Sequence, residues 1–135
     1  MAFKKIKVTI NRKRWLRATD DGYLRNSSGK MCCLGFVGRA CRIPTNVLLD
    51  QGTPVGVASA LSKGHAFRRL IDESDYYPEN KVLTVQLMDV NDFIPGEGKA
   101  KILPGSLRTN FTEAKREAFI KKGLGKLGFQ VTFTN

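Results

Sequence analysis

Residues 4–10 read Lys4-Lys5-Ile6-Lys7-Val8-Thr9-Ile10. Apolar β-branched side chains alternate there with polar ones, which is typical of a strand that is buried on one face only. The pattern returns at the end of the chain, where residues 129–134 read Phe-Gln-Val-Thr-Phe-Thr. Because a lone strand leaves its backbone donors and acceptors unpaired, we expect these two terminal segments to pair with each other.

The segments between the two strands show mostly helical patterns. Residues 31–40 are apolar or small apart from Arg39, which is typical of a buried helix. Pro44 is expected beyond the end of that helix, because proline disfavours helix at the residue before it. Pro54 suits the first turn of the next helix, and residues 82–90 form another short apolar segment.

The C-terminal part of the chain predicts a loop followed by a capped helix. Residues 93–109 contain two prolines and three glycines, which predicts a long irregular loop. Asn110 or Thr112 can cap the next helix, which carries Glu113 in its first turn. Gly128 is expected to end this helix in a left-handed conformation. Along the helix, the expected ion pairs are Glu113–Arg116 and Glu117–Lys121.

Length and composition set the fold class. The chain has 135 residues, enough for one domain, and its 41% hydrophobic content argues against disorder. No apolar run approaches the ~20 residues that cross a bilayer, and no apolar signal core follows the N-terminal lysines, so we expect neither a membrane protein nor secretion. The sequence predicts an α+β domain over residues 1–135, with three to four helices packed on a small sheet formed by the N-terminal and C-terminal strands.

The charge is the most unusual property of this sequence. Its formal net charge is +11, whereas ~2–8 is enough to keep a small domain soluble. Residues 1–42 hold eleven basic and two acidic side chains, and residues 99–135 hold eight and two. Residues 43–98 are acidic overall, with four basic and eight acidic side chains. Pairing of the terminal strands would join the two basic blocks into one electropositive surface, which favours a polyanionic ligand.

A basic cluster around the only tryptophan is the candidate ligand site. Phosphates favour several Arg and Lys donors, and bases stack on aromatic or guanidinium planes. The candidate ligand-binding residues are Arg12, Lys13, Arg14, Trp15, Arg17, Tyr23, Arg25 and Lys30. The alternative is that Trp15 anchors the core and the cations serve solubility alone.

Three cysteines and one histidine are the soft metal ligands of this chain. Cys32 and Cys33 are adjacent, unlike the pairs spaced by two to four residues in structural zinc sites, so buried reduced thiols are expected. The odd cysteine count also argues against a disulfide framework. Cys32 or Cys33 with His65 could form a nucleophile and base. Because no third, orienting group is recognisable, we expect a non-enzymatic protein with no catalytic residues, no metal and no cofactor.

One stretch of the sequence is distinctive. Residues 29–36 read Gly-Lys-Met-Cys-Cys-Leu-Gly-Phe, and residues 15–17 before them read Trp-Leu-Arg. Together with Leu87-Met88, Asn91-Asp92, residues 113–117 and the closing Gly-aromatic-x-Val-x-Phe, this stretch resembles small uncharacterised proteins of tailed bacteriophages and prophages that share a Met-Cys-Cys-Leu-Gly-Phe core. The resemblance implies a virus-encoded accessory protein of the host cytoplasm that acts on host machinery or host defence.

Three functions remain open at this point. The preferred hypothesis is a non-enzymatic phage accessory protein with an anti-defence role, which binds a phosphate-bearing anionic ligand such as a nucleotide signal. The first alternative is a nucleic-acid-binding protein whose phosphate-binding residues are Lys4, Lys5, Lys7, Arg12, Lys13, Arg14 and Arg17. The second is an inhibitor that docks on an acidic host protein, with its basic face steering the encounter. No membrane partner is expected, and the sequence leaves the oligomeric state open.

Overall fold

The computed structural model describes residues 3–20, 22–72 and 81–135. The strands in these ranges are β1 (Ile6–Asn11) and β2 (Phe129–Thr134). The α-helices are α1 (Cys33–Ala40), α2 (Thr45–Leu48), α3 (Arg69–Asp72), α4 (Leu83–Asp92) and α5 (Glu113–Gly125). The 3-10 helices, all of them short, are η1 (Pro54–Ala60), η2 (Ala66–Arg68), η3 (Ala100–Ile102) and η4 (Gly105–Leu107). The predicted α+β class is confirmed, with more helical segments than the three to four expected.

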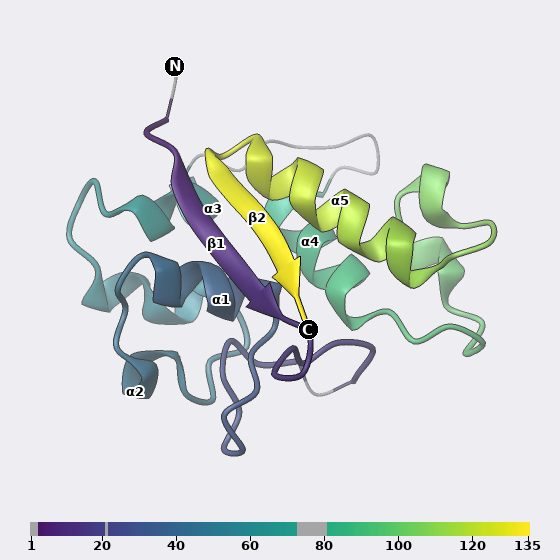
Figure 1. The fold of residues 1–135 in the computed structure, drawn as a ribbon, viewed down its shortest axis with the longest axis horizontal. Helices are drawn as coiled ribbons and strands as arrows, with labels where there is room; N and C mark the ends of the chain where they lie inside the picture. Colours follow the sequence, from purple (N-terminus) through teal and green to yellow (C-terminus); the bar gives the residue numbers. More distant parts are fainter. Residues whose placement is uncertain (1–2, 21, 73–80) are drawn as a thin grey trace.

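The two ends of the chain form the sheet, as predicted. β1 and β2 run parallel, in a register that pairs Ile6 with Phe129 and Asn11 with Thr134. Figure 1 shows the strands side by side, with α5 next to β2, and α5 and β2 are in contact. A parallel pair requires a crossover connection, so the whole chain between the two strands serves as that connection.

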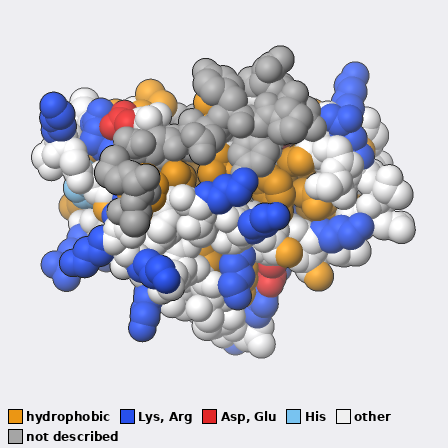
Figure 2. Space-filling view, turned by 90° about the horizontal axis from the view of Figure 1, so that it is seen from above, with side chains coloured by type: hydrophobic (Ala, Val, Ile, Leu, Met, Phe, Trp, Pro, Cys, Tyr) orange, Lys and Arg blue, Asp and Glu red, His pale blue; other side chains and the backbone are white. Residues whose placement is uncertain are grey.

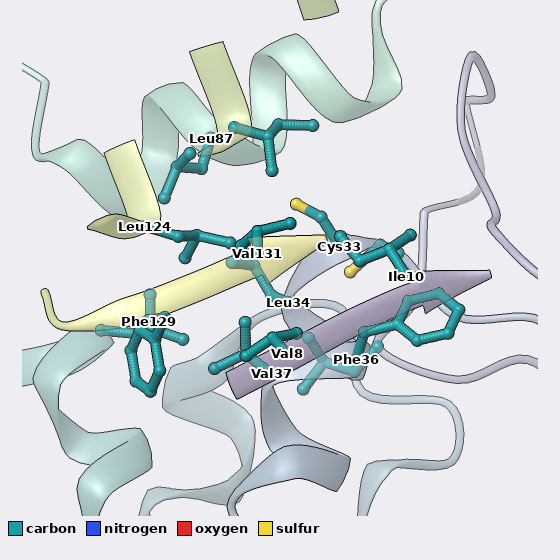
Figure 3. Close-up of a cluster of buried hydrophobic side chains, with 14 of the residues drawn as sticks. Val8, Ile10, Cys33, Leu34, Phe36, Val37, Leu87, Leu124, Phe129 and Val131 are labelled. Carbon is teal, nitrogen blue, oxygen red and sulfur yellow. The ribbon is translucent and has the colours of Figure 1, made fainter. Parts of the chain in front are cut away.

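The inner face of the sheet packs on helices from both halves of the chain. The alternate residues Val8, Ile10, Phe129 and Val131 are at most 3% exposed. Figure 3 shows these side chains among those of α1, with Leu87 of α4 and Leu124 of α5 beside β2. The period-2 pattern of the sequence therefore predicted the buried face correctly.

The outer face of the sheet is polar and open. Its exposed side chains are Lys7 and Thr9 of β1 and Gln130, Thr132 and Thr134 of β2. Parallel sheets are usually covered on both faces, so an uncovered polar face on this sheet is an unusual feature.

The buried helix predicted in residues 31–40 is α1. Its residues Cys33–Gly38 are all buried, and Gly35 allows its close approach to the preceding segment, because a Cβ there would lie 1.8 Å from the Leu24 carbonyl oxygen. The helix ends before Pro44, and Pro54 begins η1, as expected. The helix expected to continue from Pro54 to Asp72 is instead divided into η1, η2 and α3, with Gly64 in a left-handed conformation between η1 and η2.

The C-terminal part of the fold follows its local sequence. In the predicted loop 93–109, Leu103 and Leu107 are buried and anchor η3 and η4 to the core. Thr112 caps α5, with its Oγ1 accepting a hydrogen bond from the Lys115 backbone N–H at 3.1 Å. Gly128 has a φ of +83° and turns the chain into β2 as predicted. No helix within the described ranges is both long and apolar enough to span a bilayer.

Candidate functional site

Two arginines of the predicted ligand cluster bind the carboxylates of α5. Arg12 donates from Nε and Nη2 to the two carboxylate oxygens of Glu117, each at 2.8 Å. The Nε of Arg17 lies 3.0 Å from Glu113 Oε1. The hydrogen bonds from Arg12 lower the pKa of Glu117 below its ordinary value. Both guanidinium groups therefore join residues 12–17 to α5, and Arg12 is the partner of Glu117 where Lys121 was expected.

The structure decides between the two roles considered for Trp15. Its side chain is 4% exposed, and its Nε1 donates to Asn91 Oδ1 at 2.7 Å. The Arg17 guanidinium lies 4.4 Å from the centre of its ring, and the Phe133 ring lies 5.2 Å away. These neighbours leave no face for a base, so Trp15 is a core anchor, and its assignment as a ligand-binding residue is corrected.

Asn91 is a buried polar centre that the sequence analysis did not single out. It is 1% exposed, and its Oδ1 also accepts the backbone N–H of Cys33 at 3.0 Å. Its Nδ2 donates to the Leu16 carbonyl at 3.0 Å. One amide thus joins the C-terminal end of α4 to the start of α1 and to the Trp15 segment. Its place at the end of an apolar segment was visible in the sequence, but its partners were not.

Arg116 was expected to form a surface pair with Glu113. The pair is present at 2.9 Å, but the Arg116 side chain is fully buried. Its Nη1 donates to the carbonyls of Val90 and Asn91 at 2.7 and 2.8 Å, and its Nη2 donates to the Phe93 carbonyl at 3.0 Å. Arg116 therefore satisfies the last carbonyls of α4, which otherwise lack intrahelical partners.

Three of the predicted site residues lie together on the surface. The backbone N–H of Met31 donates to the Arg14 carbonyl at 3.1 Å, which places Lys30 beside Arg14. Lys13 and Arg14 follow the end of β1, and all three cations are exposed. We call Lys13, Arg14 and Lys30 the turn cations.

The other two predicted residues lie on the following segment. Tyr23 is 36% exposed, and its carbonyl accepts the Cys32 N–H at 3.1 Å. Arg25 is half-buried and forms a backbone bridge with Leu49. Of the eight predicted ligand residues, only the three turn cations are both exposed and positively charged.

Lys5 and Lys7, which were named only in the nucleic-acid alternative, and Lys121, which was not predicted, lie on the open face of the sheet. Lys5 and Lys121 line one hollow of about 370 Å³ together with Gln130. Lys121 also lines a second hollow of about 410 Å³ with Arg12 and Thr132. We call Lys5, Lys7 and Lys121 the sheet lysines. The sequence identified Lys5 and Lys7 as residues of the nucleic-acid alternative, whereas Lys121 was not predicted, because it reaches this face only through the packing of α5 beside β2.

Positive charge predominates around the sheet lysines. Glu113 and Glu117 are the acidic residues of the last 37 positions, and both are bound by arginines. The structure shows no ion pair of the sheet lysines or the turn cations with any described side chain. Figure 2, seen from the upper edge of Figure 1, shows many Lys and Arg side chains and few Asp and Glu. Pairing of the terminal strands thus brings the two basic blocks together at one surface.

The cysteine and histidine side chains do not form a reactive pair. Burial raises the pKa of Cys32 to about 12 and that of Cys33 well above its ordinary value. Both are therefore protonated thiols at neutral pH, which are poor nucleophiles. The Nδ1 of His65 accepts the backbone N–H of Phe67 at 3.2 Å and so caps η2. Within the described ranges, no group of three or more His, Cys, Asp or Glu side chains could hold a metal ion.

No protein-family model matches this chain, and no curated protein or solved structure matches it either. Its function is therefore inferred from its own side chains. The strongest feature among them is the open sheet face with the sheet lysines.

Proposed function

We propose that this protein is a non-enzymatic, phage-encoded accessory protein that binds the phosphate backbone of a nucleic acid in the host cytoplasm. The observation that carries the proposal is the open polar face of a parallel sheet, lined by lysines that have no acidic partner among the described residues. Each lysine that neutralises a phosphate releases condensed counterions, which favours binding without any enclosed pocket.

An extended nucleic acid is favoured over the single nucleotide that the sequence first indicated. Trp15 belonged to the nucleotide hypothesis alone, and its side chain is buried and bound to Asn91. Arg12 and Arg17, which both hypotheses shared, are bound by carboxylates of α5. The remaining cations are spread out along a strand. From Lys5 to Asn11 the backbone extends about 20 Å, with the turn cations beyond. Such a row fits a chain of phosphates better than one small ligand.

The chemistry of the open face predicts little preference for base sequence. Apart from lysine, its exposed side chains are threonine and glutamine. Such groups bind phosphate and sugar oxygens, which fix the position of the backbone but carry no sequence information.

Binding of a fluorescently labelled 20-base-pair duplex, followed by anisotropy between 50 and 200 mM salt, tests this proposal. We expect the triple variant Lys5→Ser/Lys7→Ser/Lys121→Ser to weaken binding at least tenfold at 50 mM salt. The slope of log affinity against log salt should fall by about 3, about one for each lysine that no longer neutralises a phosphate. A single-stranded oligonucleotide of the same length identifies the preferred form.

The matched control removes the same charge elsewhere, in the variant Arg42→Ser/Lys63→Ser/Lys101→Ser, whose three positions are also exposed. This control should keep at least half of the wild-type affinity. Equal losses in the two triple variants would show that net charge alone attracts the duplex. Wild-type protein that binds neither the duplex nor the single strand at 50 mM salt would disprove the proposal and favour an acidic host protein as the partner.

A further inference from the structure

A separate pocket of about 590 Å³ lies between α5 and the segment that contains η4. Its volume is within the range of about 300–1,000 Å³ that is usual for small-molecule sites. Its apolar surface comes mainly from Pro104 and Leu107 on one side and from Ala118 and Phe119 of α5 on the other. Neither wall contains a residue of the two strands.

The walls of this pocket are held in place by the core. Leu103 is fully buried and Leu107 is 7% exposed, and the Arg108 Nε donates to the Leu103 carbonyl at 2.9 Å. On the other side, Gly123 lets α5 lie close to α4, because a Cβ there would be 2.9 Å from Leu87 Cδ2. The pocket is therefore formed before any ligand arrives, which reduces the entropic cost of binding.

Among the described residues, the charged side chains that line this pocket are those of Lys115, Lys122 and Lys126, and none of the described lining residues is acidic. Lys115 Nζ donates to the Thr109 carbonyl at 3.1 Å, which holds this ammonium group at the edge of the pocket. Lys122 is exposed. An apolar interior with a positively charged edge is complementary to a molecule with an apolar body and an anionic head group.

We propose that this pocket binds a small amphiphilic anion, with an alkyl body between Phe119 and Leu107 and a carboxylate near Lys115 and Lys122. The pocket is distinct from the proposed nucleic-acid surface, because Lys121 lines the two hollows beside β2 whereas its neighbour Lys122 lines this pocket, although Ala118 borders both regions. Lys121 and Lys122 differ in direction by about 100° around the helix axis, so each lysine can contact a different ligand.

Isothermal titration calorimetry with decanoate, below its micelle concentration, tests the proposal. Ser106 lines the pocket and is exposed, so Ser106→Trp should fill the pocket and weaken decanoate binding at least tenfold. Lys122→Gln should weaken it about fivefold, the usual size of one exposed charge interaction. The matched control Lys121→Gln should leave decanoate affinity unchanged and should weaken duplex binding. Lys122→Gln should weaken decanoate binding and leave duplex affinity unchanged.

Neutral decanol separates the contribution of the charge from that of the apolar body. Decanol should bind wild-type protein about fivefold more weakly than decanoate, and Lys122→Gln should leave its affinity unchanged. Thermal melting confirms that each variant is folded. If Ser106→Trp does not fold, Lys122→Gln still tests the proposal, because it changes only an exposed side chain. Wild-type protein that binds no decanoate, or equal decanoate affinity in wild-type protein, Ser106→Trp and Lys122→Gln, would overturn the proposal without affecting the nucleic-acid hypothesis.

Discussion

Residues 12–17 and the open face of the β1–β2 sheet are both rich in positive charge, but they use it differently. In the first region, Arg12 and Arg17 are held by Glu117 and Glu113. In the second, the sheet lysines are exposed and form no ion pair with a described carboxylate, although Glu117, which is bound by Arg12, lines one hollow together with Lys121. The planar guanidinium donates several hydrogen bonds in a defined geometry, whereas the lysine ammonium is a strongly hydrated point charge on a flexible stem. In this protein, the arginines hold elements together and the lysines supply the charge that a ligand can use.

The comparison is tested most strongly at Arg116, the most buried of the arginines. Arg116→Ala removes the donors to two α4 carbonyls and to the Phe93 carbonyl that follows the helix. It is expected to cost about 3–5 kcal/mol of unfolding free energy, as for other broken buried charge networks. Guanidinium-induced unfolding measures this loss. Arg116→Lys keeps the charge but cannot reach all three carbonyls, so most of the loss should remain. A change below 1 kcal/mol in both variants would contradict the structural role.

Trp15 provides the next largest expected effect. Trp15→Phe keeps an aromatic ring but loses the Nε1 hydrogen bond to the buried Asn91, which is expected to cost about 1–3 kcal/mol of unfolding free energy. Duplex affinity should stay unchanged, because Trp15 is a core anchor. Anisotropy and chemical unfolding of the same preparation compare the two quantities. A variant with unchanged stability and reduced duplex affinity would instead identify Trp15 as a stacking residue.

The smallest effect is expected at the half-buried Arg12–Glu117 pair, and it depends on pH. Because the pKa of Glu117 is lowered in the folded state, this pair stabilises the protein above the unfolded-state pKa of Glu117, and the stabilisation is lost as the pH falls through the folded-state value. Glu117→Gln should therefore reduce the melting temperature at pH 7 and leave it nearly unchanged at pH 3. A variant that lowers it equally at both pH values would show that the charge is not responsible.

Much of the fold could be predicted because its determinants are local. The alternation in β1 and β2, the Thr112 cap and the Gly128 turn each depend on a few neighbouring residues. The candidate site was predicted less well. The cluster around Trp15 was recognised as basic, but three of its residues are engaged in the interior or with α5, because partners distant in the sequence neutralise or cover them.

The sequence by itself determined the local elements and the charge of the molecule. These are terminal strands that are buried on one face, a last helix with an N-terminal cap, and a large excess of positive charge. The tertiary structure alone decided which of these charges are free. Arg12 and Glu117 are 105 residues apart and meet only because β1 lies beside β2 and α5. The same packing places Lys121 at the hollows beside β2 and Lys122 at the pocket beside η4. Since electrostatic attraction depends on distance in space and on exposure to water, no order of residues along the chain distinguishes a bound cation from an available one.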